Sequence, residues 1–354
     1  MDFSKELEDL VTTVIREDAS DLHLTVGRYP TLRVQGTLVP LTQKKILTPD
    51  VVTGLIFTML SKPQQDEFVR TKELDFSFDH KGRARFRGNT FFQRGFMGCA
   101  LRLVPVKIRT VEELSLPPIL KEFSRREQGF FLVVGPTGQG KTTTLAAIVD
   151  LINHERAEHV LTIEDPIEYL FIADRSIVDQ REVRLDTTDF HVALRSMFRE
   201  DINVAMIGEM RDFETMSAAV TAAETGHLIF SSLHTNNAAQ SIDRIIDSFP
   251  PAQQSQIRSQ LANTILGIFS QRLLPRVSGG LIPAYELMIA NSAIKNLIRE
   301  SRIHELDLVI DTSSQDGMIS LNRSLKDLLQ RGEITMESAV AYSLNPEELR
   351  MISR

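Results

Sequence analysis

The stretch GPTGQGKT, residues 135–142, fits the pattern G-x-x-x-x-G-K-[ST]. The apolar run FFLVV comes directly before it, and the helical run TTTLAAIVDLIN overlaps its end. With a strand before and a helix after, the pattern predicts a loop whose backbone N–H groups surround phosphates at a helix N-terminus. We expect Lys141 to reach the β- and γ-phosphates of a nucleotide and Thr142 to ligate Mg²⁺. The residues predicted to bind the nucleotide are Gly135, Pro136, Thr137, Gly138, Gln139, Gly140, Lys141, Thr142 and Thr143.

Beyond this loop, short apolar runs alternate with helical ones. Continuous apolar strands separated by helical crossovers indicate a parallel sheet that is buried on both faces. From Pro250 onward the pattern is mostly helical. The strands are expected at FFLVV, HVLTI, INVAMI and HLIFSSL, and the helices at TTTLAAIVDLIN, FHVALRSMF and ETMSAAVTAAET.

Polar residues follow the C-terminal ends of these strands: Glu164 and Asp165, then Glu209, then His234. In an open parallel sheet those ends share one crevice, beside the phosphate loop. We expect Glu209 to hold Mg²⁺ directly or through water, Glu164 to act as the base that orients the attacking water, and His234 to sense the γ-phosphate. The alternative for each carboxylate is a helix cap, which suits Asp165 before Pro166 better than it suits the two glutamates.

The first 105 residues predict a small α/β domain. Apolar residues at helical spacing follow Phe3, and DLHLTVG alternates as a half-buried strand does. Thr48-Pro49-Asp50 predicts the start of a second helix. Three strand-like runs follow, ELDFSFDH, RARFRGNTFFQ and FMGCALRLV. Residues 106–118 are interpreted as a linker, and residues 119–354 as the nucleotide-binding domain with a helical C-terminal region.

The run RARFRGN places an arginine at every second position, Arg83, Arg85 and Arg87, and no Asp or Glu occurs between His80 and Val111. One interpretation is a charged face of an edge strand, which blocks edge-to-edge pairing. The other is catalytic, because an arginine at the transferring phosphoryl group accelerates such reactions by about 10³- to 10⁵-fold. The nucleotide domain offers no obvious arginine of this kind. We therefore expect Arg85, Arg87 and Arg102 to act there if the first domain, of the same or a neighbouring chain, closes over the nucleotide.

Composition narrows the class of protein. The chain has 354 residues and a net charge of −7, which argues weakly against a general nucleic-acid binder. Its single cysteine, Cys99, excludes a disulfide framework, suits a reducing cytoplasm and is expected in a core. The acidic N-terminus does not resemble a secretory signal. No stretch approaches the roughly 20 apolar residues of a membrane-spanning helix, so we expect membrane contact only through partners.

Three segments carry a resemblance to a known family: LTIEDPIEYLF (161–171), GEMRDFETMSAAVTAAETGHLIFSSLHT (208–235) and AIKNLIRE (293–300). They resemble the signature segments of the PilT family, the retraction ATPases of type IV pili within the secretion-type ATPases. ASDLHL (19–24) and RFRGN (85–89) also fall where that family has similar strings. The likeness spans essentially the whole chain. It implies an α/β fold, with an N-terminal PAS-like domain followed by a RecA-like P-loop ATPase domain with a helical C-terminal part.

The resemblance also implies roles for residues. Glu164 is similar to the family's catalytic glutamate and Glu209 to its Mg²⁺-associated glutamate, while His227 and His234 fall in its histidine box. Arg85, Arg87 and Arg102 match its interdomain arginines. AIKNLIRE resembles a segment linked to retraction, although its helical spacing also fits a plain amphipathic surface helix.

At the level of the whole protein, the resemblance implies an ATP-hydrolysing, Mg²⁺-dependent homohexameric motor that powers pilus retraction in twitching motility. Such a ring is cytoplasmic and lies beneath an inner-membrane pilus platform protein, without inserting into the membrane. Paralogous pilus ATPases are further expected partners. No nucleic-acid partner is expected.

Several positions depart from the family pattern. Ile202 and Asn203 replace a usual Pro-Asp, and Leu281, Tyr285 and Lys295 replace residues that are frequently Arg, His and Arg. Gln139 and Thr142 are tolerated changes in the loop. These departures leave open an accessory paralogue of PilU type, or a regulatory nucleotide-binding subunit that needs an active partner. A pilus extension ATPase usually has a further N-terminal domain and a cysteine cluster, and a nucleic-acid translocase would use the basic run as its track.

Overall fold

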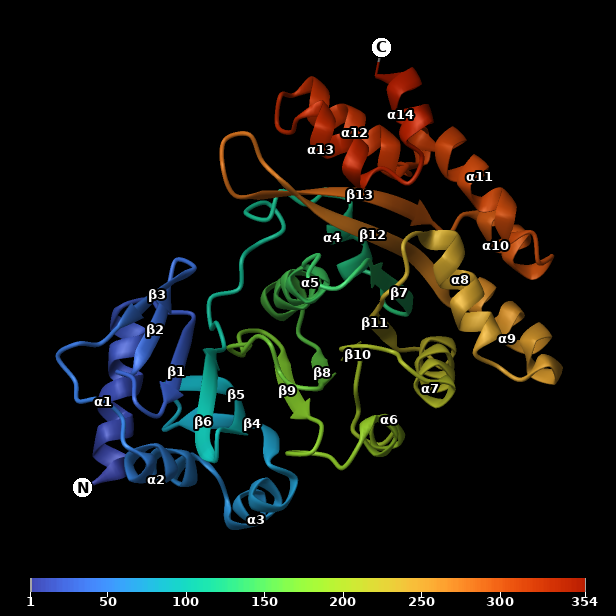
Figure 1. Ribbon diagram of the computed structural model, residues 1–354. Helices are drawn as coiled ribbons and strands as arrows, with labels where there is room; N and C mark the ends of the chain where they lie inside the picture. Colours follow the sequence, from blue (N-terminus) through green and yellow to red (C-terminus); the bar gives the residue numbers. More distant parts are fainter. Residues whose placement is uncertain (1, 354) are drawn as a thin grey trace. The chain divides into compact units, whose positions relative to one another are not determined.

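The computed structural model describes residues 2–353, which form two compact units divided between Pro105 and Val106. Each unit has its own sheet (Figure 1). The predicted α/β fold class is confirmed.

The first unit is an antiparallel sheet in the order β3-β2-β1-β6-β5-β4 with helices packed on it. The helix α1 forms because Leu7, Leu10, Val11 and Val14 recur on one side, and all four are buried. Its elements are α1 (Phe3–Arg16), β1 (Asp21–Thr25), β2 (Thr31–Val34), β3 (Thr37–Pro40), α2 (Pro49–Met59), α3 (Lys62–Thr71), β4 (Glu73–His80), β5 (Ala84–Gln93) and β6 (Phe96–Leu103). The sequence did not predict α3, whose KPQQDEFVRT buries only Phe68.

The second unit has a seven-stranded sheet in the order β13-β12-β7-β11-β10-β8-β9. All neighbouring strands are parallel except β12 and β13. Its strands are β7 (Gly129–Val134), β8 (His159–Glu164), β9 (Ile177–Glu182), β10 (Val204–Ile207), β11 (Leu228–Leu233), β12 (Ile265–Pro275) and β13 (Leu281–Ile289). Every residue of β7, β10 and β11 is buried, as the continuous apolar runs predicted.

Helices cover both faces of this sheet. Phe130, Leu132 and Val134 point into a core with α6 to α11, whereas Phe131 and Val133 point into a core with α4 and α5. The second core also contains Val111 and Leu116 from the segment 106–118. These helices are α4 (Leu120–Ser124), α5 (Lys141–Glu155), α6 (Phe190–Met197), α7 (Phe213–Glu224), α8 (Ala238–Asp247), α9 (Pro251–Thr264), α10 (Ser292–Arg299) and α11 (Leu306–Thr312).

The expectation of a mostly helical region after Pro250 is wrong for residues 265–289. They form the hairpin β12–β13, and β12 also pairs with β7 in parallel. The apolar residues of ILGIFSQRLLP do not alternate with polar ones, and such a run does not distinguish a buried strand from a buried helix. The helices α12 (Leu321–Gln330), α13 (Met336–Tyr342) and α14 (Pro346–Ile352) lie beside this hairpin (Figure 1). Leu274 and Ile282 of the hairpin share a buried cluster with Leu325 of α12.

Within residues 2–353, no helix is both long and apolar enough to cross a membrane. Cys99 is buried in the core of the first unit, as expected, and burial raises the pKa of its thiol.

Candidate functional site

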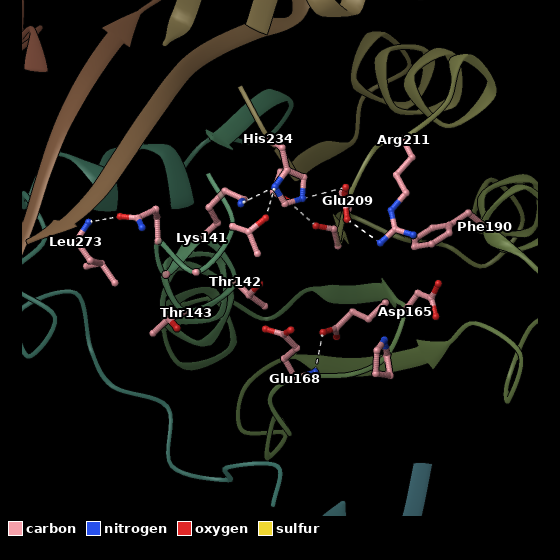
Figure 2. Close-up of a pocket in the computed structure, with 18 residues that line it drawn as sticks. Lys141, Thr142, Thr143, Asp165, Glu168, Phe190, Glu209, Arg211, His234 and Leu273 are labelled. Carbon is pink, nitrogen blue, oxygen red and sulfur yellow. Dashed lines mark hydrogen bonds and ion pairs between the residues drawn. The ribbon is translucent and has the colours of Figure 1, made fainter. Parts of the chain in front are cut away.

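The C-terminal ends of β7, β8, β10 and β11 meet at a cavity of about 450 Å³, a volume typical of small-molecule sites (Figure 2). Each parallel strand delivers the residues that follow it to the same edge of the sheet. The lining residues are Thr137, Gly138, Gln139, Gly140, Lys141, Thr142, Thr143, Glu164, Asp165, Pro166, Glu168, Phe190, Gly208, Glu209, Arg211, Ser232, His234 and Leu273.

The phosphate loop joins β7 to α5. Gly140 immediately precedes α5 in a left-handed conformation, φ +78°, which glycine adopts without the steric cost of a Cβ. The Lys141 Nζ donates hydrogen bonds to the carbonyl oxygens of Gly135 (2.9 Å) and Pro136 (3.0 Å). Burial lowers the pKa of Lys141, while Glu209 and Glu168 act in the opposite direction. The loop thus combines a cation with the free N–H groups of a helix N-terminus, an arrangement suited to phosphate.

A network around His234 connects the loop to β10. His234 Nε2 lies 3.0 Å from the Glu209 carboxylate, and its Nδ1 lies 3.3 Å from both Lys141 Nζ and Thr137 Oγ1 (Figure 2). Arg211 donates to the other Glu209 oxygen at 3.0 Å. Burial would raise the pKa of Glu209, but Arg211 and His234 outweigh it and hold the pKa below its usual value. Glu209 is therefore an anion held between two nitrogen donors.

Glu164, the last residue of β8, is buried. Burial raises its pKa to about 7, although three groups donate to its carboxylate: the Thr162 hydroxyl (2.8 Å), the Glu168 N–H (3.3 Å) and the Gln180 amide (3.4 Å). A carboxyl group with a pKa near neutrality is suited to general-base catalysis.

We expect kcat/KM for nucleotide hydrolysis to rise about tenfold from pH 6 to pH 8, because Glu164 is a base only when ionised. The Thr162→Val variant loses the hydroxyl that favours the ionised form, so its pH profile should shift to higher pH. A steady-state pH series with both proteins checks this. A profile without this rise in the unaltered protein would contradict the role of Glu164.

Thr142 and Glu209 fit the magnesium ion that the sequence predicted. A threonine hydroxyl and an ionised carboxylate line the same cavity, and these are the oxygen ligands that Mg²⁺ prefers.

The structure does not bring every predicted residue to the cavity. His227 precedes β11, so the length of that strand, roughly 20 Å, separates it from His234. Its Nδ1 lies 3.0 Å from the Ala222 carbonyl oxygen, and its ring contacts Phe198. His227 thus belongs to the opposite end of the strand. Gly135 and Pro136 do not line the cavity but hold Lys141 through their carbonyl groups.

Sequence reasoning missed Arg211, Glu168 and Leu273. The sequence offered no obvious arginine of this kind in the nucleotide domain, yet Arg211 lines the cavity and contacts Glu209. A signal existed, since Arg211 stands two residues after Glu209 in GEMRD. Leu273 lies on β12, a strand that the sequence pattern did not predict.

The predicted arginines lie in the first unit. Arg85 and Arg87 alternate on β5 with the buried Ala84, Phe86 and Gly88, as the sequence pattern indicated. Arg83, however, lies in the turn before β5, and its guanidinium lies 3.8 Å from Glu8.

Arg102, on β6 opposite Arg87, donates to Asp21 at 2.9 Å. Burial would raise the pKa of Asp21, but hydrogen bonds from Ser20 and Arg102 hold it below its usual value. Arg102 therefore has a structural partner within its own unit.

The loop after β11 is held by buried charges of the hairpin. Arg272 donates to the carbonyl and side-chain oxygens of Asn236 (3.1 and 3.0 Å), and Glu286 accepts from the Ala238 N–H (2.8 Å). Burial raises the pKa of Glu286 to about 7, above its ordinary value of 4.5. A raised carboxyl pKa contributes stability below pH 4.5, and this contribution is lost as the pH rises through 7.

We therefore expect Glu286→Gln to stabilise the second unit at pH 8 by on the order of 2 kcal/mol, and to have little effect near pH 4.5. Glu333→Gln is the matched control with the opposite sign, because hydrogen bonds from Arg276 lower the pKa of Glu333. Thermal unfolding at the two pH values measures both variants. Destabilisation of Glu286→Gln at pH 8 would show that its charge is favourable there.

Known proteins resemble this chain over nearly its whole length. A family model described as type II/IV secretion system protein matches residues 3–281. The type IV pilus retraction ATPase PilT of Pseudomonas aeruginosa is 42% identical over 347 residues, 97% of this chain and 99% of that protein. The chain belongs to the PilT family of ATPases. The resemblance carried by the sequence motifs is confirmed.

Two further members of the PilT family support the assignment. The type IV pilus ATPase PilU of Pseudomonas aeruginosa is 38% identical over 348 residues, which are 98% of this chain and 91% of that protein. A crystal structure of the pilus retraction motor PilT with bound ADP superposes with a TM-score of 0.90 at 43% identity, covering 98% of each chain. The RecA-like fold of the second unit is that of this family.

Proposed function

We propose that this chain is an ATP-hydrolysing motor that powers type IV pilus retraction. The observation that carries the proposal is the cavity, where a phosphate loop, an ionised Glu209 and a Glu164 with a pKa of about 7 come together. The pilus part of the proposal is supported by relatives that are named as pilus retraction ATPases or motors. The alternative of a PilU-type accessory subunit is not better supported, since PilU is 38% identical and PilT 42% identical, and Lys141, Glu164 and Glu209 all line the cavity.

In this mechanism the loop and Lys141 bind the phosphates of ATP. Glu164 accepts the proton of the attacking water, and Glu168 and Thr162 hold its carboxylate in place. Bound Mg²⁺ neutralises phosphate charge and would be held by Thr142 and, directly or through water, by Glu209. His234 responds to the γ-phosphate, a role supported by its contacts with Glu209 and Lys141.

The proposal extends to the assembly. The chain acts as a homohexamer in the cytoplasm, attached to an inner-membrane platform protein of the pilus and working beside paralogous ATPases. Arg85, Arg87 and Arg102 provide positive charge toward a nucleotide, and Arg102 also donates to Asp21 within its own unit. The Ile294, Leu297 and Ile298 side chains of α10 are buried, so any contact of AIKNLIRE with a partner uses its polar side.

Retraction of fluorescently labelled pili tests the function. Cells that lack the gene should extend pili without retracting them, and the unaltered chain should restore retraction whereas Lys141→Ala should not. Normal retraction in the absence of the gene would overturn the pilus assignment and leave the ATPase assignment to be judged by turnover.

A further inference from the structure

The strand β12 extends past the end of its neighbour. Its pairing with β7 ends at Ser270 opposite Val134, and residues 271–275 continue beside the phosphate loop. The approach is close, since a Cβ at Gly135 would lie 2.5 Å from the Gln271 carbonyl oxygen. Gly135 also has φ +148°, which disfavours any other residue. The main chains of the loop and of β12 are therefore in direct contact.

Two glutamine amides continue the connection where the strand pairing stops. Gln271 accepts a hydrogen bond from the Thr144 hydroxyl (2.7 Å) and donates one to the Gln139 carbonyl oxygen (2.8 Å). The Gln139 side chain accepts from the Leu273 N–H at 2.7 Å. We call the hydrogen bonds Thr144–Gln271, Gln271–Gln139 and Leu273–Gln139 the amide clamp. On the other side of β12, Leu273 lies opposite Pro283, which has no N–H to donate.

The amide clamp lies between the site and the helical C-terminal part. Leu274, the residue after Leu273, packs with Ile282 and Leu325 in the core that holds α12 to α14 on the hairpin. The neighbouring residues of β12 hold the His234 loop, because Ser270 and Arg272 both donate to the Asn236 carbonyl oxygen. One strand thus contacts the phosphate loop, the histidine loop and the C-terminal core.

We infer that Gln139 and Gln271 are positioning residues that couple phosphate binding to the order of the hairpin β12–β13. This inference rests on the proposed function, because it requires a nucleotide at the loop. Its physical basis is that ordering the loop around phosphate fixes the Gln139 carbonyl and side chain, which strengthens their hydrogen bonds to β12.

Hydrogen exchange of the full chain, with and without saturating ADP and Mg²⁺, tests the inference. Gln139→Met keeps the length of the side chain but removes the acceptor for the Leu273 N–H. Gln271→Met removes the hydrogen bonds of the Gln271 side chain with the Thr144 hydroxyl and the Gln139 carbonyl oxygen. Gln65→Met is the matched control, because Gln65 donates to the Phe57 and Leu60 carbonyl oxygens of the first unit. Each variant is compared at equal saturation with ADP, and its thermal unfolding is measured alongside.

In the unaltered protein and in Gln65→Met, ADP should slow exchange in residues 135–144 and, by about tenfold, in residues 271–276. In Gln139→Met, ADP should still slow exchange in the loop, but it should slow exchange in residues 271–276 by less than about twofold. Equal protection of 271–276 in both glutamine variants and the unaltered protein would overturn the coupling. Absence of protection at 135–144 in the unaltered protein would instead remove the proposed nucleotide site, and the inference with it.

Discussion

Replacing Lys141 by alanine should abolish ATP turnover, a loss of at least about 10³-fold, while the fold persists. The ammonium group is the cation of the phosphate loop, and removing a preorganised donor at a developing charge costs about 10²- to 10³-fold by itself. The fold should tolerate the change, because burial disfavours this charge and lowers its pKa. ATP hydrolysis and thermal unfolding of the purified variant measure both parts.

Lys326→Ala is the matched control for this prediction, because Lys326 is a half-buried lysine of the second unit that does not line the site. It should keep full turnover. A folded Lys141→Ala protein that hydrolyses ATP at the normal rate would show that GPTGQGKT is not the phosphate site.

The double variant Arg85→Ala/Arg87→Ala should lose about 10³- to 10⁵-fold in turnover if these arginines reach the transferring phosphoryl group. Their β5 positions project away from the buried Phe86, so their loss leaves the core of the first unit intact. Mixing this variant with Glu164→Ala, also inactive, should restore part of the activity. Recovery occurs only where arginines of one subunit complete the site of another.

Arg83→Ala/Arg94→Ala controls for loss of positive charge, because these arginines belong to the turns before and after β5. That protein should remain active. Full activity of Arg85→Ala/Arg87→Ala would mean that RARFRGN is only a charged strand face. If both variants are inactive, and mixing restores no activity although subunits exchange, the arginines act within their own chain.

Local pattern accounts for what the sequence predicted. Each of these elements is determined by residues that are close in the sequence. This holds for the apolar runs of β7, β10 and β11 and for the glycines of the phosphate loop, so strand, loop and helix could be predicted from local sequence. The same rule places Glu164, Glu209 and His234 at one edge, because parallel strands end together. Adjacency misleads for His227, which shares a motif with His234 but lies at the other end of β11.

What the sequence did not predict depends on distant pairing. The hairpin β12–β13 has no alternation to distinguish it from helix, and its partner β7 is more than a hundred residues earlier. Gln271 therefore gave no sign of its contacts with Gln139 and Thr144. Likewise the pKa of Glu164 depends on burial and on Gln180 of β9, a strand that the sequence pattern did not indicate.

Mg²⁺-dependent ATP hydrolysis by the purified chain, compared with Glu164→Gln, tests the central claim most directly. Nucleotide binding is measured on both proteins, so that binding and hydrolysis are separated. We predict steady turnover by the unaltered chain alone and unchanged ATP binding with lost turnover in Glu164→Gln. ATP binding without turnover in the unaltered chain, or equal turnover in the two proteins, would contradict the assignment of an ATPase that uses Glu164 as its base.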